Sequence, residues 1–230
     1  MPDIQISTPD GKFSAYLASP KGAAGGGVLV IQEIFGVNKD MRDHCDHLAA
    51  QGYFALCPDI FWRQEPGIQI TDKTEAEWAK AFELYKGFDV AKGVADLKAS
   101  LAHLRKLKGV NGKAGTVGFC LGGLLAYLMA TESDADCNVA YYGVGIDERL
   151  AAAAKIAKPT ILHIAAEDGF VSKEAQAKIN AALKGHRHVT IHTYPGVDHA
   201  FARNNGVNYN KAAAQQAEKR TLACFKANLA

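Results

Sequence analysis

Short runs of apolar residues alternate along the chain with longer segments whose apolar residues recur at helical spacing. The apolar runs predict buried strands over 28–32, 53–57, 115–119, 139–142, 160–164 and 189–194. Helical spacing predicts helices over 40–50, 74–85, 90–106, 121–131, 172–183 and 209–228. Buried strands that alternate with helices are typical of a mainly parallel sheet covered by helices on both faces. The pattern therefore predicts an α/β fold.

Two segments near the N-terminus predict an antiparallel hairpin at one edge of this sheet. They are 4–7 and 12–17, and the turn sequence Pro-Asp-Gly at 9–11 joins them. The sequence Ala-Ala-Gly-Gly-Gly at 23–27 predicts a short turn. Because the chain has no internal repeat and no low-complexity linker, we expect residues 1–230 to form a single domain. Ligands of such sheets bind beyond the carboxyl ends of the strands, so functional residues are expected there.

The strand 115–119 is followed at once by a candidate nucleophile, Cys120. The sequence Gly-Phe-Cys-Leu-Gly-Gly at 118–123 is a G-x-C-x-G motif, which matches the G-x-S-x-G nucleophile elbow with sulfur in place of oxygen. Its glycines allow a sharp turn where a strand and a helix approach closely. The N-terminus of the helix that follows favours both a thiolate and an oxyanion. Cys120 is therefore predicted to be the nucleophile.

Two later strand ends supply an acid and a base. Asp168 lies just after a late strand, and His199 lies just after the last strand. The chain order nucleophile, acid, histidine is that of the α/β-hydrolase fold. Glu167 and Asp198 are neighbouring alternatives for the acid. The three strand ends together predict an α/β-hydrolase that acts on an ester-like bond.

Each of these assignments has a structural alternative. Cys120 could be a small buried core residue, and Asp168 could cap a helix or a turn. No serine of the chain lies in a G-x-S-x-G motif, so no serine competes for the role of nucleophile. The other cysteines are interpreted as packing residues: Cys45, Cys57, Cys137 and Cys224.

His44 and His47 lie one helical turn apart, in an Asp-His-Cys-Asp-His run at 43–47 that could suggest a metal site. Such a site would need a third ligand and an open coordination position. The sequence offers no obvious supplier of the third ligand. We therefore interpret the run as a polar helix face and predict no metal.

Composition narrows the class of protein. The formal net charge is +2, and no basic run stands out, so neither nucleic acid nor an anionic membrane is an expected partner. No apolar stretch is long enough to predict a spanning helix, and the first residues lack the pattern of a signal peptide. The 5 cysteines are widely spread without a C-x-x-C pair, which argues against a disulfide framework. We expect a cytoplasmic protein.

The chain resembles the dienelactone hydrolase (carboxymethylenebutenolidase) family over nearly its whole length. The resemblance rests on QEIFGVN at 32–38, QGY at 51–53, CPD at 57–59, GFCLGG at 118–123, YYGVG at 141–145 and HAFAR at 199–203. It implies a small, single-domain, cofactor-free hydrolase with a Cys-His-Asp triad. We expect a monomer that takes a small lactone or ester substrate and passes through a thioester acyl-enzyme.

The resemblance also gives roles to residues beside the triad. It implies that Glu33 contacts the cysteine and helps to deprotonate it when substrate binds. The structural alternative for Glu33 is an ion pair with an arginine such as Arg203, and the two interpretations are compatible. The backbone N–H groups of Ile34 and Leu121 are expected to form the oxyanion hole.

Substrate choice is the least determined part of the prediction. By resemblance, Arg203 matches one of two arginines that bind a substrate carboxylate, but Trp78 stands at the expected place of the second. An indole cannot replace a guanidinium, although three nearby cations could compensate: Arg63, Lys73 and Lys80. Helical spacing makes Trp78, Phe82 and Tyr85 either core residues or, with Phe35, part of the substrate site. Three functions stay open: a dienelactone hydrolase of aromatic catabolism, a broader esterase or thioesterase that prefers neutral esters, and a non-enzymatic binding module.

Overall fold

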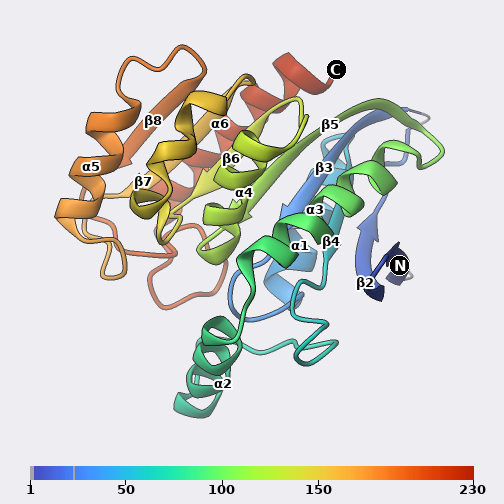
Figure 1. Ribbon diagram of the computed structural model, residues 1–230, viewed down its shortest axis with the longest axis horizontal. Coiled ribbons are helices and arrows are strands. Elements are labelled where there is room, and N and C mark those ends of the chain that lie inside the picture. Colours follow the sequence, from blue (N-terminus) through green and yellow to red (C-terminus); the bar gives the residue numbers. More distant parts are fainter. Residues whose placement is uncertain (1–2, 23) are drawn as a thin grey trace.

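A computed structural model describes residues 3–22 and 24–230, and its centre is one eight-stranded sheet (Figure 1). The strands stand in the order β1-β2-β4-β3-β5-β6-β7-β8. Their bounds are β1 Asp3–Thr8, β2 Gly11–Ala18, β3 Gly25–Ile31, β4 Phe54–Pro58, β5 Val110–Phe119, β6 Asn138–Tyr141, β7 Thr160–Ala165 and β8 Val189–Tyr194. Strand β2 pairs antiparallel with both β1 and β4, and every later pair is parallel. The predicted sheet and its N-terminal hairpin are confirmed.

Helices cover both faces of this sheet. Helices α3, α4 and α5 pack on one face, and α1 and α6 pack on the other. Helix α2 lies apart from the sheet, on the side where β3 ends (Figure 1). No helix in the described part of the chain is both long and apolar enough to cross a membrane. The bounds are α1 Lys39–Ala50, α2 Glu75–Lys86, α3 Val90–Arg105, α4 Leu121–Glu132, α5 Lys173–Leu183 and α6 Lys211–Leu229.

The alternation of side chains along β3 divides the core between these two faces. Leu29 and Ile31 belong to the cluster under α3 and α4, whereas Val28 and Val30 belong to the cluster under α1 and α6. Successive side chains of a strand point to opposite faces, so an entirely apolar strand needs helices on both. Burial of each such side chain stabilises the fold by roughly 1.5–3 kcal/mol. The packed sheet is the rigid frame from which the loops at its carboxyl edge extend.

The structure differs from the prediction at the start of β3. Gly25–Gly27 belong to the strand, so the prediction of a turn over 23–27 is wrong for these three residues. Ala23 lies outside the described residues. These glycines serve close packing, because a Cβ on Gly26 would lie 2.6 Å from Cβ of Leu229 at the end of α6. Two short 3-10 helices were not predicted: η1 Ile146–Glu148 and η2 Leu150–Lys155.

Candidate active site

Cys120 sits on a strained turn between β5 and α4. Its φ and ψ are 56° and −115°, although it carries a side chain, and it is 8% exposed. A backbone in this region costs on the order of 1–3 kcal/mol, so the surroundings must impose it. The flanking glycines show how, because a Cβ on Gly118 would lie 1.9 Å from the carbonyl oxygen of Gly122. The backbone N–H of Cys120 also donates to the carbonyl of Tyr141 on β6, at 3.1 Å. The turn has the geometry of a nucleophile elbow.

His199 and Asp168 meet at the ends of β8 and β7. Both carboxylate oxygens of Asp168 lie 3.0 Å from Nδ1 of His199, and both side chains are buried. The backbone N–H groups of Phe170 and Val171 donate to Oδ1 of Asp168 at 2.8 and 3.1 Å. A carboxylate fixed in this way holds the imidazole ring in one orientation, with a proton on Nδ1. Nε2 of His199 is buried and has no hydrogen-bond partner among the described residues.

The environment of His199 favours its protonated form. Burial lowers the pKa of His199, but the negative charge of a Cys120 thiolate and the hydrogen bond that His199 donates to Asp168 outweigh it and raise the pKa to about 10. The cysteine and the histidine line the same pocket. The two side chains therefore lie where a proton can pass between the nucleophile and the imidazole.

The two alternative acids make other contacts. Oδ1 of Asp198 accepts hydrogen bonds from the backbone N–H groups of Gly169, at 2.8 Å, and His199, at 2.6 Å. Glu167 is exposed and pairs with Lys173 at 2.9 Å. Asp168 is therefore the carboxylate placed against the imidazole ring, and Asp198 supports the two loops that carry the pair.

Glu33 and Arg203 form a buried ion pair at the same edge of the sheet. Nε of Arg203 donates to Oε2 of Glu33 at 2.6 Å, and Nη1 of Arg203 donates to Oδ2 of Asp72 at 2.7 Å. The guanidinium also lies 4.8 Å from the centre of the Phe35 ring. Oε1 of Glu33 is buried and, in the described residues, has no hydrogen-bond partner. The expected ion pair is thus present, and one carboxylate oxygen of Glu33 is left uncommitted.

A mainly apolar pocket opens over these groups. It encloses about 370 Å³, including its mouth, and its lining residues come from the elbow, the loop after β3, helix α2 and the loops that follow β6, β7 and β8. Trp78 is stacked on Phe82, at 5.5 Å between ring centres, and meets Phe35 edge-on at 5.1 Å. The predicted aromatic residues therefore line the pocket. The full lining is Ile34, Phe35, Trp78, Phe82, Tyr85, Cys120, Val144, Phe170, His199 and Arg203.

Three residues at the site were not predicted from the sequence. Phe170 is 49% exposed, lies 4.9 Å from the His199 ring and 6.3 Å from Trp78, and closes one side of the pocket. Its position two residues after Asp168 was the available signal. Val144 adds to the same wall, and Asp72 is the second partner of Arg203.

The cations that could compensate for Trp78 already bind other groups of the protein. Arg63 binds Asp96 and Asp10, and Lys80 binds Glu65 and Glu83. Lys73 lies 3.7 Å from Oδ1 of Asp72 and donates to a backbone carbonyl. Among the described residues that line the pocket, Arg203 is the only Lys or Arg, and it already faces two carboxylates. The pocket is therefore closer to neutral than a site built around two arginines.

The two expected oxyanion donors flank Cys120. Leu121 is the first residue of α4, where an N–H group has no partner within the helix. The N–H of Ile34, which lies outside the helices and strands, donates no backbone hydrogen bond within the described residues.

The cluster 43–47 does not form a metal site in the described part of the chain, where no three His, Cys, Asp or Glu side chains converge. His44 and His47 lie on α1 and face α6.

The cysteines interpreted as packing residues are free thiols; Cys45, Cys57 and Cys137 are buried and Cys224 is half-buried.

Comparison with known proteins gives a consistent result. A model of the dienelactone hydrolase family matches residues 13–229. A protein of Azospirillum brasilense is 51% identical over 232 residues, which cover 100% of both chains. The carboxymethylenebutenolidase of Pseudomonas sp. (strain P51) is 38% identical over 94% of this chain and 90% of its own. A crystal structure from Klebsiella pneumoniae subsp. pneumoniae has a TM-score of 0.87 at 27% identity, over 98% of this chain and 97% of that one.

Proposed function

The chain belongs to the dienelactone hydrolase family of carboxylic ester hydrolases, and from this premise we propose that it opens a lactone through a thioester on Cys120. The observation that carries the proposal is the elbow cysteine beside His199, whose other ring nitrogen lies 3.0 Å from both oxygens of Asp168. Every group that the reaction needs belongs to the chain itself.

Acylation begins with attack of the Cys120 thiolate on the lactone carbonyl. A bond forms between Sγ and the carbonyl carbon, and the carbonyl oxygen becomes an oxyanion that accepts hydrogen bonds from the N–H groups of Ile34 and Leu121. When the oxyanion collapses, the ring C–O bond breaks. The leaving oxygen takes the proton from Nε2 of His199, and it stays attached to the acyl chain because the substrate is cyclic.

Deacylation uses the same histidine as a base. Neutral His199, oriented by Asp168, takes a proton from water while the water oxygen attacks the thioester carbon. The C–S bond then breaks, which leaves a Cys120 thiolate beside protonated His199, the state from which attack began. The released carboxylic acid gives its proton to the solvent and leaves as a carboxylate. Asp168 stays ionised throughout, as the geometry of its two backbone donors favours.

Glu33 is assigned to the first proton transfer. An unperturbed thiol is only a few per cent ionised at neutral pH, so removal of its proton limits attack. The uncommitted oxygen of Glu33 supports a role as a second acceptor for that proton. Its other oxygen is held by Arg203, so a substrate group that engages Arg203 would free Glu33 to act.

Two substrate classes compete for this pocket. Arg203 favours a lactone that carries a carboxylate, and the Pseudomonas relative is named a carboxymethylenebutenolidase. The aromatic wall of Trp78, Phe82 and Phe170 favours the second candidate, an esterase that prefers neutral esters. A single arginine that is already paired with two carboxylates weakens selection for an anion, which keeps the second candidate open.

The deciding experiment compares kcat/KM for a dienelactone with kcat/KM for a neutral p-nitrophenyl ester. Cys120→Ala is the blank, and Cys224→Ala, a half-buried cysteine remote from the pocket, is the matched control. Fast lactone opening that disappears only in Cys120→Ala supports the lactone hydrolase, and ester cleavage alone supports the esterase. An acyl adduct on the peptide that contains Cys120, trapped by acid and seen by mass spectrometry, tests the thioester. Full activity in Cys120→Ala would exclude both.

A further inference from the structure

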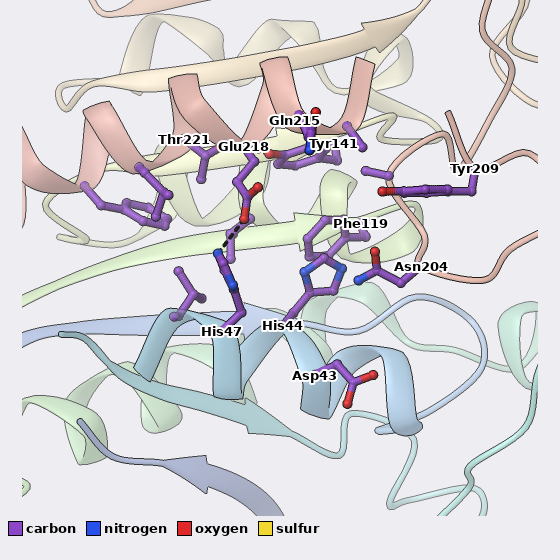
Figure 2. Close-up of a pocket in the computed structure, with 16 residues that line it drawn as sticks. Asp43, His44, His47, Phe119, Tyr141, Asn204, Tyr209, Gln215, Glu218 and Thr221 are labelled. Atoms are coloured by element: carbon purple, nitrogen blue, oxygen red, sulfur yellow. Dashed lines mark hydrogen bonds and ion pairs between the residues drawn. The ribbon is translucent and has the colours of Figure 1, made fainter. Parts of the chain in front are cut away.

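A second cavity lies between helices α1 and α6, on the face of the sheet opposite α3 and α4 (Figure 2). It encloses about 950 Å³, including its mouth, and it shares no lining residue with the pocket over Cys120. Its floor is formed by β5 and β6, and its rim by the segment that follows His199. We call it the α1–α6 cavity. Its lining is Asp43, His44, His47, Leu48, Val117, Phe119, Tyr141, Ala202, Asn204, Tyr209, Ala214, Gln215, Glu218, Thr221, Leu222 and Phe225.

Flat aromatic faces line the floor of the α1–α6 cavity. The imidazole of His44 is stacked on Phe119, with 4.6 Å between ring centres and 21° between planes, and Tyr141 lies 4.8 Å from Phe119. Burial lowers the pKa of His44 to about 4, so this ring is neutral at physiological pH. Its Nε2 atom is 3.6 Å from the nearest Asp40 oxygen, beyond hydrogen-bond distance. Stacked neutral rings provide a surface on which another planar ring can lie.

Polar side chains with no internal partner project around these rings. Figure 2 shows the amides of Asn204 and Gln215 and the phenol of Tyr209 at the cavity. All three residues are exposed to solvent, and within the described residues their side chains make no hydrogen bond to the protein. Each amide offers both a donor and an acceptor. The cavity can therefore bind the polar edge of a ring as well as its face.

Both carboxylates that line the α1–α6 cavity already have a partner. Glu218 pairs with His47 at 2.5 Å, and Asp43 pairs with Lys39 at 2.7 Å. Figure 2 marks the first of these pairs across the opening between the helices. None of the described residues that line the cavity is Lys or Arg. An anion would find no cation there, and a cation would find no carboxylate without a partner.

We propose that the α1–α6 cavity is a second binding site, for an uncharged planar heterocycle of one or two rings with hydrogen-bond donors and acceptors on its edge. The ring lies against the imidazole of His44, which is itself stacked on the buried Phe119, and its edge meets the amides of Asn204 and Gln215. This site adjoins the catalytic residues in sequence, because Phe119 precedes Cys120 and Asn204 follows Arg203. It does not depend on the function proposed above.

The test is an NMR titration of the intact protein with three uncharged heterocycles: adenine, uracil and quinazolin-4-one. Benzoate and benzylamine serve as planar anionic and cationic controls. At least one heterocycle is expected to bind saturably with Kd below about 1 mM, and the charged rings at least about tenfold more weakly. Ala214→Phe fills the cavity and should abolish binding, whereas Ala212→Phe, one exposed position on the same helix but outside the cavity, should not.

A milder pair of variants keeps the test decisive if Ala214→Phe does not fold. Gln215→Ala removes one amide from the cavity and should weaken binding about fivefold, the value of one hydrogen bond. Gln216→Ala changes the neighbouring exposed glutamine, which lies outside the cavity, and should leave Kd unchanged. The proposal is overturned if no heterocycle binds with Kd below about 1 mM, if benzoate or benzylamine binds equally well, or if Gln215→Ala and Gln216→Ala behave alike.

Discussion

Arg203 holds Glu33 by a hydrogen bond of 2.6 Å from Nε to Oε2, inside a site where the other oxygen of the same carboxylate has no partner. The two residues lie 170 positions apart in the chain. A buried ion pair of this kind adds little to stability compared with an apolar pair, but breaking it leaves a buried charge. The pair therefore fixes one oxygen of Glu33 and leaves the other oxygen free to accept a hydrogen bond.

The first prediction concerns this carboxylate. Glu33→Gln removes a proton acceptor while keeping the shape of the side chain, so kcat/KM should fall by about 10²-fold or more. The rate at which iodoacetamide alkylates Cys120 in the presence of a substrate analogue, read peptide by peptide in a mass spectrometer, should fall with it. Asp72→Asn, which changes only the other partner of Arg203, is the control and should have a smaller effect. Equal alkylation rates in wild type and Glu33→Gln would remove Glu33 from the mechanism.

The second prediction concerns the carboxylate that orients the histidine. Asp168→Asn should lower kcat by about 10²–10⁴-fold, because an amide can stabilise the wrong tautomer of His199 and cannot stabilise the imidazolium. Since the hydrogen bond that His199 donates to Asp168 helps to raise the pKa of His199 to about 10, the substitution should also lower that pKa. Titration of the His199 ring by NMR measures the shift. Asp198→Asn is the neighbouring control, and a titration curve in Asp168→Asn equal to that of wild type would contradict the prediction.

Most of the fold could be predicted from the pattern of the chain. The sheet strands were identified as short apolar runs and the helices by apolar residues at helical spacing. The family resemblance, the α/β-hydrolase type of fold and the class of ester hydrolase are confirmed. The glycines at 25–27 were misinterpreted, because a run of glycines is the same signal whether a turn or a close helix contact requires it. The contact of Gly26 with Leu229 joins positions too far apart for a local pattern to reveal.

The residues of the site also fall into those that a local sequence pattern marks and those that only the folded structure brings together. Cys120, Asp168 and His199 were predicted because each follows a recognisable strand and the order of the three is informative. The ion pair of Arg203 with Glu33 was predicted, but its second partner, Asp72, was missed because the segment around Asp72 carries no motif. Phe170 was missed because an exposed aromatic residue in a loop has no periodicity. The α1–α6 cavity could not be predicted, because it exists only where two helices distant in sequence pack side by side.

The third prediction concerns substrate choice. Trp78→Arg places a guanidinium on the wall of the pocket, where it can bind a substrate carboxylate. The ratio of kcat/KM for a carboxylated lactone to kcat/KM for a neutral ester should rise about tenfold. Trp78→Phe keeps the wall apolar and should leave the ratio unchanged. If both substrates are affected to the same extent in Trp78→Arg, position 78 does not select the substrate.

The fourth prediction concerns Gly122, two residues after Cys120. A Cβ on Gly122 would lie 2.2 Å from the carbonyl oxygen of Ile31, so Gly122→Ala must push α4 away from β3. The free energy of unfolding should fall by about 3 kcal/mol, as seen when well-packed cores are overfilled. Urea unfolding followed by circular dichroism measures the change. Gly22→Ala is the matched control, because a Cβ there meets nothing within 4 Å; equal unfolding midpoints for the two variants would contradict the close approach at the elbow.

The last prediction concerns Asp40, in the first turn of α1. Burial, followed by the charge of Glu33, raises the pKa of Asp40 from 3.8 to about 7, against the opposing charge of Arg203. The folded state therefore holds this proton more tightly than the unfolded chain does. As pH rises from about 4 to about 7, the unfolded state gains an ionised carboxylate that the folded state disfavours, so stability falls over that window.

Asparagine at position 40 has no titrating proton, so Asp40→Asn should not lose stability over this pH window. Its free energy of unfolding relative to wild type should increase by on the order of 2 kcal/mol between about pH 5 and pH 7, and then stay level. Urea unfolding at several pH values gives both curves. Asp43→Asn is the control, because that carboxylate is more exposed and already pairs with Lys39 at 2.7 Å. A constant difference between Asp40→Asn and wild type across this window would mean that Asp40 is ionised in the folded protein throughout, and that Arg203 outweighs both burial and Glu33.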